Sequence, residues 1–214
     1  MPTPAPPRNR FERRRAETRQ ALIRAARELL AEQGDTGASI QSIADRADVG
    51  FGSFYNHFES KTELFDAAVA DALDEFGQAI DERLQGVVDD PAELVAAGFR
   101  LTARMADSHP EVVQILRHRG LRHIHSELGI APRALRDVER GIATGRFADA
   151  DPLSALAAMG GVLLSLVELR FARPDLDGEE AASNMAEMTL RMLGVPLDEA
   201  REVARRPLPA VGGV

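Results

Sequence analysis

The segment Phe51–His57 combines residue types that suit contact with nucleic acid. It contains no acidic residue, and on a short helix its outer positions would be Phe51, Gly52, Ser53, Tyr55, Asn56 and His57. A helix of this kind can enter a groove of duplex DNA and present aromatic rings and hydrogen-bond donors to it. The same pattern also occurs on surface helices of ordinary bundles. The segment alone therefore leaves both interpretations open.

The residues around this segment would hold it in place from behind. Between residues 39 and 58 the inner face is formed by Ile40, Ile43, Ala44, Ala47, Val49, Phe54 and Phe58. Ala44 and Ala47 are small, which lets two helices cross closely. Ser39 is a suitable N-cap for the first helix, and a turn of about four residues leads to the second, as in a helix-turn-helix.

Charge is distributed unevenly along the chain, whose net charge is −8. Residues 1–20 carry six arginines against Glu12 and Glu17, a net charge of +4. Residues 65–214 carry 16 basic and 25 acidic side chains, a net charge of −9. A basic arm on an acidic body is typical of proteins that meet phosphate, although a disordered basic tail looks the same.

The composition excludes several classes of protein. The chain has no cysteine, so disulfide scaffolds, zinc fingers, iron–sulfur clusters and thiol catalysis are excluded. No uncharged apolar stretch reaches roughly 18 residues, and no apolar signal segment follows the N-terminus. We therefore expect a cytoplasmic protein with no membrane partner.

Helix signals occur along the whole chain, and no segment has the alternation of a strand. We predict an all-α fold of nine or ten helices, with Gly34 at the C-cap of the first. The predicted helices cover residues 13–33, a short stretch from 39, 51–57, 60–85, 91–107, 109–126, 132–147, 152–173, 178–194 and 197–206. The expected divisions are a disordered basic arm at 1–12, a DNA-binding domain at 13–64, an effector-binding and dimerisation domain at 65–206 and a flexible tail at 207–214.

The run Arg19–Leu64 resembles the DNA-binding domain of the tetracycline-repressor (TetR) family of bacterial regulators. The matching residues, in unbroken order, are Ala25-Ala26, Leu29-Leu30, Gly34, Ser39-Ile40, Ile43-Ala44, Ala47, Val49, Tyr55, Phe58, Ser60-Lys61 and Leu64. The chain departs from the family at two positions: Asp48 replaces the usual turn glycine, and Gly50 replaces a capping Ser or Thr. Asp tolerates the left-handed conformation at a cost of about 1 kcal/mol, and Gly is an acceptable N-cap.

The resemblance implies a set of DNA contacts and no catalytic residue or cofactor. The implied contact residues are Ser39, Gln41, Phe51, Gly52, Ser53, Tyr55, Asn56, His57 and Lys61. Phe51 and Ser53 would point toward base edges, and Tyr55 and His57 toward phosphates. Lys61, the only lysine in the chain, would meet a phosphate at the start of the fourth helix.

The resemblance also implies an effector pocket and a two-fold dimer in the C-terminal domain. Candidate pocket residues are Phe99, Met105, Ile115, Leu116, Arg119, Met159 and Leu163, each of which also suits a plain core. The expected dimer face is formed by Leu156, Gly160, Leu163, Leu164, Val167, Met185, Met188 and Met192, and the methionine stripe alone equally suits a core. Arg100, Arg104, Arg119 and Arg170 either pair with an acidic ligand or form salt bridges. His109, His118, His123 and His125 do not converge at helical spacing, so we expect no metal site.

These observations favour a homodimeric repressor that binds an inverted-repeat operator and is released by a small-molecule effector. The fourth helix would couple the two sites, because its capped start holds Lys61 and its far end would join the pocket. The alternatives are an activator with the same binding apparatus and a helical small-molecule binding protein without an operator. An enzyme is disfavoured, because the sequence has no phosphate loop, nucleophile elbow or H-E-x-x-H motif.

Overall fold

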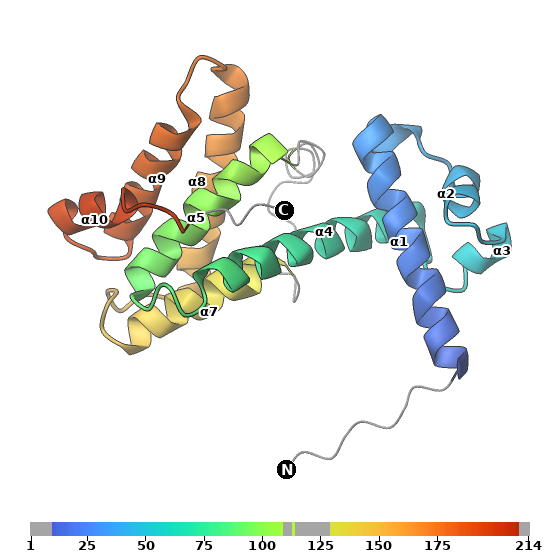
Figure 1. Ribbon diagram of the computed structural model, residues 1–214, viewed down its shortest axis with the longest axis horizontal. Coiled ribbons are helices and arrows are strands. Elements are labelled where there is room, and N and C mark those ends of the chain that lie inside the picture. Colours follow the sequence, from blue (N-terminus) through green and yellow to red (C-terminus); the bar gives the residue numbers. More distant parts are fainter. Residues whose placement is uncertain (1–9, 109–112, 114–128, 210–214) are drawn as a thin grey trace, which may run out of the picture. The chain divides into compact units, whose positions relative to one another are not determined.

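The computed structural model describes residues 10–108, Val113 and residues 129–209. Within this part of the chain there are nine helices and no strand, which confirms the all-α prediction (Figure 1). Contacts divide the chain into two compact units, Met1–Val69 and Ala70–Val214. The helix expected at residues 109–126 lies almost entirely outside the described residues.

The first unit contains three helices and the start of a fourth. Their bounds are α1 Arg10–Gly37, α2 Ile40–Arg46, α3 Phe51–Phe54 and α4 Lys61–Leu84, which continues into the second unit. The buried side chains of the unit include Leu22, Ile23, Ile43, Phe54, Phe58, Leu64 and Phe65. These side chains come from all four helices, so one small apolar core holds the short α2 and α3 against the longer helices.

The ends of α1 differ from the prediction at both sides. The helix begins at Arg10, so residues 10–12, expected to lie in a disordered arm, are helical. Glu12 lies in the first turn, where a carboxylate stabilises the helix dipole. The helix also continues past Gly34 and ends at Gly37, so the predicted C-cap at Gly34 is wrong. A glycine inside a helix costs only about 1 kcal/mol, so it does not by itself end the helix.

The second unit is a helical bundle with one large apolar core and a smaller apolar cluster formed by Ile80, Leu84, Leu94, Ala97 and Leu101. Its remaining helices are α5 Pro91–Ser108, α7 Ile130–Ala143, α8 Pro152–Ala172, α9 Gly178–Met192 and α10 Leu197–Ala204. In Figure 1, α5 lies among α7, α8, α9 and α10, all of which pack against it. Asp151 and Asp177 cap α8 and α9 with their side chains, as the sequence predicts.

The chain leaves α7 earlier than expected because of one close contact. A Cβ atom on Gly141 would lie 2.0 Å from the ring of Phe147, so only glycine leaves room for this ring. Gly145 adopts a φ of 70°, which turns the chain back over the end of the helix. The helix therefore ends at Ala143 instead of continuing to residue 147.

Helix α8 is apolar on most of its surface. By length and composition alone it is the one described helix that could cross a membrane, under a criterion that allows up to two charged residues. Glu168 and Arg170 lie in this helix, so the prediction that no uncharged apolar stretch reaches about 18 residues still holds. The core helices of soluble proteins meet the same criterion. Ala155, Met159 and Leu166 of α8 are buried in the core of the second unit.

Candidate nucleic-acid interface

Helix α2 is fixed at its start by two reciprocal hydrogen bonds. The Ser42 backbone N–H donates to the Ser39 hydroxyl at 3.0 Å, and the Ser39 backbone N–H donates to the Ser42 hydroxyl at 2.9 Å. The first backbone N–H groups of a helix have no carbonyl partner within it, and these two hydrogen bonds supply partners for two of them. Ser39 is the N-cap that the sequence predicts, and its side chain remains exposed at the surface.

The turn between α2 and α3 has the four-residue length expected of a helix-turn-helix. Asp48 adopts a left-handed conformation with a φ of 54°. This is expected, because the TetR family usually has a glycine at this position of the turn. Gly50 is the N-cap of α3 and provides no side-chain hydrogen bond. Ser53 N–H donates to the Gly50 carbonyl at 2.8 Å, so the backbone alone closes this first turn.

The recognition segment is shorter as a helix than predicted. Helix α3 ends at Phe54, and residues 55–57 form turns instead of a continued helix. The backbone N–H groups of His57 and Phe58 still donate to the Phe54 carbonyl, at 2.9 and 3.0 Å. Phe54 and Phe58, four residues apart, are both buried and hold this segment against the core of the first unit. Residues 51–57 nevertheless form one compact, hydrogen-bonded unit.

The outer face of this segment is the surface that the sequence assigns to DNA. Phe51 is 46% exposed and Tyr55 is 55% exposed, and their rings meet edge to face with centroids 5.7 Å apart. Gly52 and Asn56 are exposed, whereas Ser53 and His57 are half-buried. Large exposed apolar rings are unusual on a protein surface and indicate a binding face when they cluster.

Two other residues assigned to DNA make contacts within the protein. The Lys61 ammonium donates to the Ala38 carbonyl at 3.1 Å and lies 5.7 Å from the centroid of the Phe65 ring. The Gln41 amide donates to the Asp45 carboxylate at 2.6 Å. Because an ammonium has three donors, the contact of Lys61 with Ala38 leaves donors for a phosphate. The start of α4 is capped by Ser60, whose hydroxyl accepts from Glu63 N–H at 3.1 Å.

Basic side chains of α1 lie beside the end of the recognition segment. The Arg19 guanidinium lies 5.0 Å from the centroid of the Phe58 ring. The pKa of His57 is lowered, first because the imidazole is partly buried and then because Arg15 and Arg19 are close to it. The neutral form of His57 is therefore favoured in the free protein. These arginines were not among the DNA contacts that the resemblance implied.

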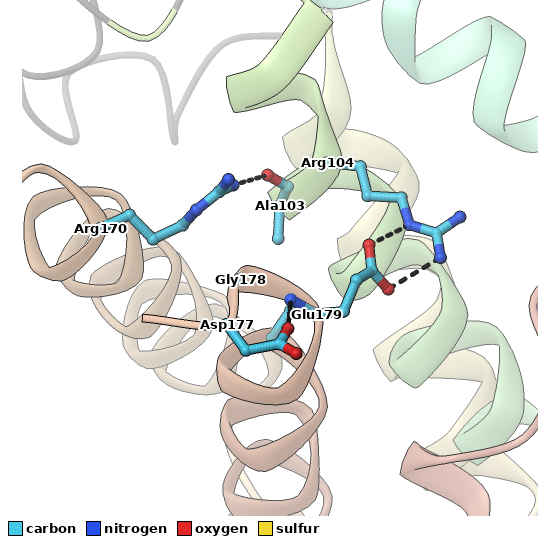
Figure 2. Close-up of a pocket in the computed structure, with 7 residues that line it drawn as sticks. Ala103, Arg104, Arg170, Asp177, Gly178 and Glu179 are labelled. Carbon is cyan, nitrogen blue, oxygen red and sulfur yellow. Dashed lines mark hydrogen bonds and ion pairs between the residues drawn. The ribbon is translucent and has the colours of Figure 1, made fainter. Parts of the chain in front are cut away.

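A small pocket in the second unit has a volume of about 140 Å³ (Figure 2). It is lined by Ala103, Arg104, Arg170, Asp177, Gly178, Glu179 and Ala182. Two hydrogen bonds join the Arg104 guanidinium to the Glu179 carboxylate. Nε donates to Oε1, and Nη2 donates to Oε2 at 2.7 Å. Arg170 donates to the Ala103 carbonyl at 3.2 Å. The arginines at this pocket are thus already engaged in contacts within the chain.

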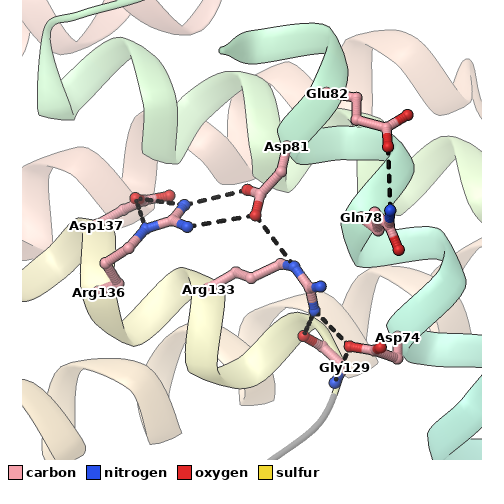
Figure 3. A network of polar contacts seen from close by, with 8 residues as sticks. All are labelled: Asp74, Gln78, Asp81, Glu82, Gly129, Arg133, Arg136 and Asp137. Atoms are coloured by element: carbon pink, nitrogen blue, oxygen red, sulfur yellow. Dashed lines mark hydrogen bonds and ion pairs between the residues drawn. The ribbon is translucent and has the colours of Figure 1, made fainter. Parts of the chain in front are cut away.

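A second polar cluster joins α4 to α7 (Figure 3). The Arg133 guanidinium donates to Asp74 at 2.7 Å, to Asp81 at 3.1 Å and to the Gly129 carbonyl at 2.5 Å. Arg136 donates to the other oxygen of Asp81 at 3.0 Å and also pairs with Asp137. The hydrogen bond from Arg133 lowers the pKa of Asp74, whereas burial raises the pKa of Asp137. We call this group of residues the α4–α7 network.

The candidate effector residues fall in different places. Phe99 and Met159 are buried in the core of the second unit, and Leu163 packs against that core. Ile115, Leu116, Arg119 and the side chain of Met105 lie outside the described residues. None of the described candidates lines the pocket of Figure 2. The four histidines at positions 109, 118, 123 and 125 also lie outside the described residues, and the rest of the described chain contains no cluster of three potential metal ligands.

The candidate dimer residues divide between surface and interior. Met188 is 60% exposed and Met192 is 45% exposed on α9. Gly160, Leu163, Leu164 and Met185 are half-buried, and Leu156 and Val167 are buried within the protomer. Leu153, Leu169 and Phe171 add further exposed apolar surface on α8. Sequence reasoning missed these three residues, because the periodicity of an almost wholly apolar helix does not show which face is outside.

Taken together, the fold and the first unit define a helix-turn-helix protein with a separate all-α C-terminal unit. Two family models match the chain. Residues 22–68 match "Bacterial regulatory proteins, tetR family", and residues 90–206 match "Tetracyclin repressor-like, C-terminal domain". The second match alone covers more than half of the chain, and the chain belongs to the TetR family.

Individual relatives agree with this assignment. The chain is 37% identical over 76 residues to the HTH-type transcriptional repressor DhaR of Mycobacterium sp. (strain GP1), and the match covers 36% of each chain. The chain therefore spans only about a third of this curated relative. It is also similar to RolR, which has been crystallised with resorcinol (32% identity, TM-score 0.69, 92% of this chain and 98% of RolR) and without ligand (34%, 0.77, 89% and 98%).

Proposed function

We propose that the protein is a transcriptional repressor that binds an inverted-repeat DNA operator as a homodimer and leaves it when a small-molecule effector binds. The observation that carries this proposal is the acid-free face of residues 51–57, held from behind by the buried rings of Phe54 and Phe58. A recognition segment works by presenting its side chains to the groove in a fixed geometry. The proposal involves no catalytic step and places the protein in the cytoplasm with the chromosome.

The proposed DNA contacts are the residues that the family resemblance implies. Phe51 and Ser53 meet base edges, and a thymine methyl group suits the exposed Phe51 ring. Ser39, Tyr55 and Lys61 hold the backbone of the DNA on both sides of the groove. In support, the Ser39 hydroxyl lies at the surface of the first unit, and Lys61 has donors beyond its contact with Ala38.

The experiment is a titration of the purified protein on duplex DNA from upstream of its own gene. We expect a saturable complex that tolerates an excess of scrambled duplex, and a large loss of affinity when one half of the inverted repeat is scrambled. The logarithm of the affinity should fall linearly with the logarithm of the salt concentration. If the protein binds the upstream and scrambled duplexes equally at moderate salt, the proposal is wrong.

The proposed dimer uses the exposed faces of α8 and α9. Met188 and Met192 project from α9, and Leu153, Leu169 and Phe171 add apolar surface on α8. Covering exposed apolar area of this kind with a second copy of the chain removes it from water and so stabilises the dimer. Met188→Glu should convert the dimer to a monomer in sedimentation equilibrium. Val87→Glu changes an equally exposed side chain outside α8 and α9 and should leave the dimer intact.

The proposed effector is resorcinol or another small hydroxylated aromatic compound. The support is the similarity to RolR, which covers 92% of this chain and includes a structure with resorcinol. Resorcinol should raise the melting temperature of the protein and release it from the operator. Benzene-1,3-diol derivatives with both hydroxyl groups methylated provide the control, because they retain the ring and lose the donors.

Helix α4 is the proposed route of coupling between the two functions. It runs from Lys61 in the first unit to Leu84 in the second. In the second unit the α4–α7 network holds its side chains Asp74 and Asp81 to Arg133 of α7. The protein would have a state that binds DNA and a state that does not, and these contacts would differ between them. An effector that binds one state more tightly than the other would shift the population of DNA-binding dimers.

A further inference from the structure

The end of the recognition segment lies beside a row of arginines on α1. Arg15 and Arg19 are four residues apart, so their side chains leave the same face of the helix. Arg19 reaches the Phe58 ring, which directly follows His57 in the chain. Both arginines are exposed, and His57 is half-buried at the same place. Three basic groups from two separate elements therefore converge on one spot of the first unit.

No acidic side chain neutralises this spot within the described part of the chain. Arg13, on another face of α1, pairs with Glu17 at 3.3 Å, whereas none of the described acidic residues forms an ion pair with Arg15 or Arg19. The lowered pKa of His57 has burial as its first cause and the two arginines as its second. The positive charge thus acts on His57 without a compensating carboxylate.

We propose that Arg15, Arg19 and His57 form a single phosphate-binding cluster that holds the DNA backbone next to the recognition segment. This inference rests on the proposed function and adds residues of α1 to the DNA-binding surface. The bound group is a phosphodiester of duplex DNA. It meets the guanidinium forks of Arg15 and Arg19 directly, and the imidazole of His57 donates to the same or the adjacent phosphate.

The stacking of Arg19 prepares it for this role. A guanidinium that lies over an aromatic face keeps its N–H groups in the plane of the fork, directed away from the ring. Because Phe58 is buried and fixed by the core, Arg19 loses less conformational freedom when it binds a phosphate. Lysine at this position would retain the charge and lose the planar fork.

The position of the cluster also explains why the recognition segment can be short. Helix α3 itself contains only four residues and no basic side chain. A helix this short needs phosphate contacts from neighbouring elements to fix its register in the groove. Arg15 and Arg19 would provide them at the end of the segment, and Ser39 and Lys61 would provide them elsewhere on the first unit.

The test compares four variants with the wild-type protein on the operator duplex and on a scrambled duplex. Arg15→Ala and Arg19→Ala each remove one proposed contact, and Arg19→Lys keeps the charge. Arg13→Ala is the matched control, because it removes an exposed arginine of the same helix that is already paired with Glu17. Affinities are measured by fluorescence anisotropy over a range of salt concentrations, and the melting temperature of each variant shows whether it is folded.

The affinity falls as salt rises, and this dependence should become less steep in Arg15→Ala and in Arg19→Ala. We expect the magnitude of the slope of log affinity against log salt to decrease by about 0.9 per protomer in each variant. Both substitutions should lower the affinity for the operator and for the scrambled duplex by a similar factor, because a phosphate contact carries no sequence information. Arg19→Lys should retain the wild-type slope with lower affinity, and Arg13→Ala should match the wild type.

The outcomes separate this inference from the proposed function. If the wild-type protein shows no preference for the operator, the proposed function fails. If the wild type prefers the operator but Arg15→Ala and Arg19→Ala keep its slope, as Arg13→Ala does, the cluster does not bind phosphate and only the inference is overturned. A folded Arg19→Ala variant that loses affinity without a change of slope would likewise contradict it.

Discussion

The two units of the protein hold their polar side chains in different ways. In the first unit the side-chain contacts along α2 are local: Ser39 forms hydrogen bonds with Ser42, and Gln41 with Asp45. In the second unit several ion pairs join segments that are far apart in the sequence, as in Arg146 with Asp90 and Glu199, or Arg206 with Glu93. Local contacts form whenever the helix forms, whereas long-range ion pairs depend on the arrangement of whole helices.

This difference suits the two proposed roles. A DNA-binding face gains affinity when its side chains are already in place before the DNA arrives. A ligand-binding unit must instead have two arrangements of similar free energy, because a ligand can only shift an equilibrium that exists. Partly exposed ion pairs such as those of Arg133 contribute little net stability and can be exchanged for contacts with a polar ligand at small cost.

The proposed DNA face depends on the core of the first unit, and the largest effect is expected when this core is disrupted. Phe54 is fully buried and contacts the rings of Tyr55 and Phe58. Phe54→Ala should destabilise the first unit by about 3–5 kcal/mol and abolish operator binding. Hydrogen exchange should show lost protection in residues 10–69 and unchanged protection in the helices of the second unit.

Phe51→Ala is the matched control for this prediction. Phe51 belongs to the same helix, but its ring is exposed. The substitution should weaken operator binding through the lost base contact while the unfolding free energy changes by less than about 1 kcal/mol. Equal unfolding free energies for the two variants would show that the recognition segment is not held by its buried face.

The same contrast explains what the sequence could and could not predict. The N-cap at Ser39, the left-handed Asp48 and the N-cap at Gly50 were predicted correctly, because each depends on residues within one turn. The early end of α7 was missed, because it depends on the ring of Phe147 meeting the one residue of the helix that has no side chain. Periodicity places Gly141 on a helix but does not show what packs against it.

The α4–α7 network was missed for a related reason. Arg133 pairs with Asp74 and Asp81, which precede it by 59 and 52 residues. Spacing within a helix cannot reveal such partners, because they depend on which two helices pack together. The sequence did place Arg104 and Arg170 among the arginines that either pair within the chain or meet a ligand. Both make contacts within the chain at the pocket of Figure 2, and a role toward a ligand stays a prediction.

A smaller effect is expected from a change in the α4–α7 network of the second unit. Arg133→Gln removes the positive charge between Asp74 and Asp81 and keeps a polar side chain of similar length. If the α4–α7 network carries the coupling, this variant should bind the operator nearly as well as the wild type but respond less to resorcinol. A coupling free energy lower by about 0.5–2 kcal/mol is expected for a residue that transmits the response. Operator titrations with and without resorcinol measure it.

Arg140→Gln is the control on the same helix. Arg140 also forms an ion pair, with the exposed Asp89, but that residue follows α4 in the chain. Its loss should leave the response to resorcinol unchanged. If Arg133→Gln and Arg140→Gln both respond as fully as the wild type, the network is only a structural contact and coupling takes another route.

The smallest expected effect concerns the positive charge around His57. Its pKa is lowered in the folded protein, first by burial and then by Arg15 and Arg19, whereas in the unfolded chain it returns to its ordinary value near 6.5. Between these two pKa values the unfolded chain binds a proton that the folded protein does not, so folding becomes less favourable as the pH falls through this range. Above the ordinary value both states are neutral and the effect disappears.

The measurement is the unfolding free energy of the wild type and of His57→Gln at pH values from 8 down to 5. The other four histidines are present in both proteins, so their titration cancels in the difference. The wild type should lose more stability than His57→Gln as the pH falls, and His57→Gln combined with Arg15→Ala and Arg19→Ala should show the same pH dependence as His57→Gln alone. A constant separation between wild type and His57→Gln at every pH would mean that folding does not lower the pKa of His57.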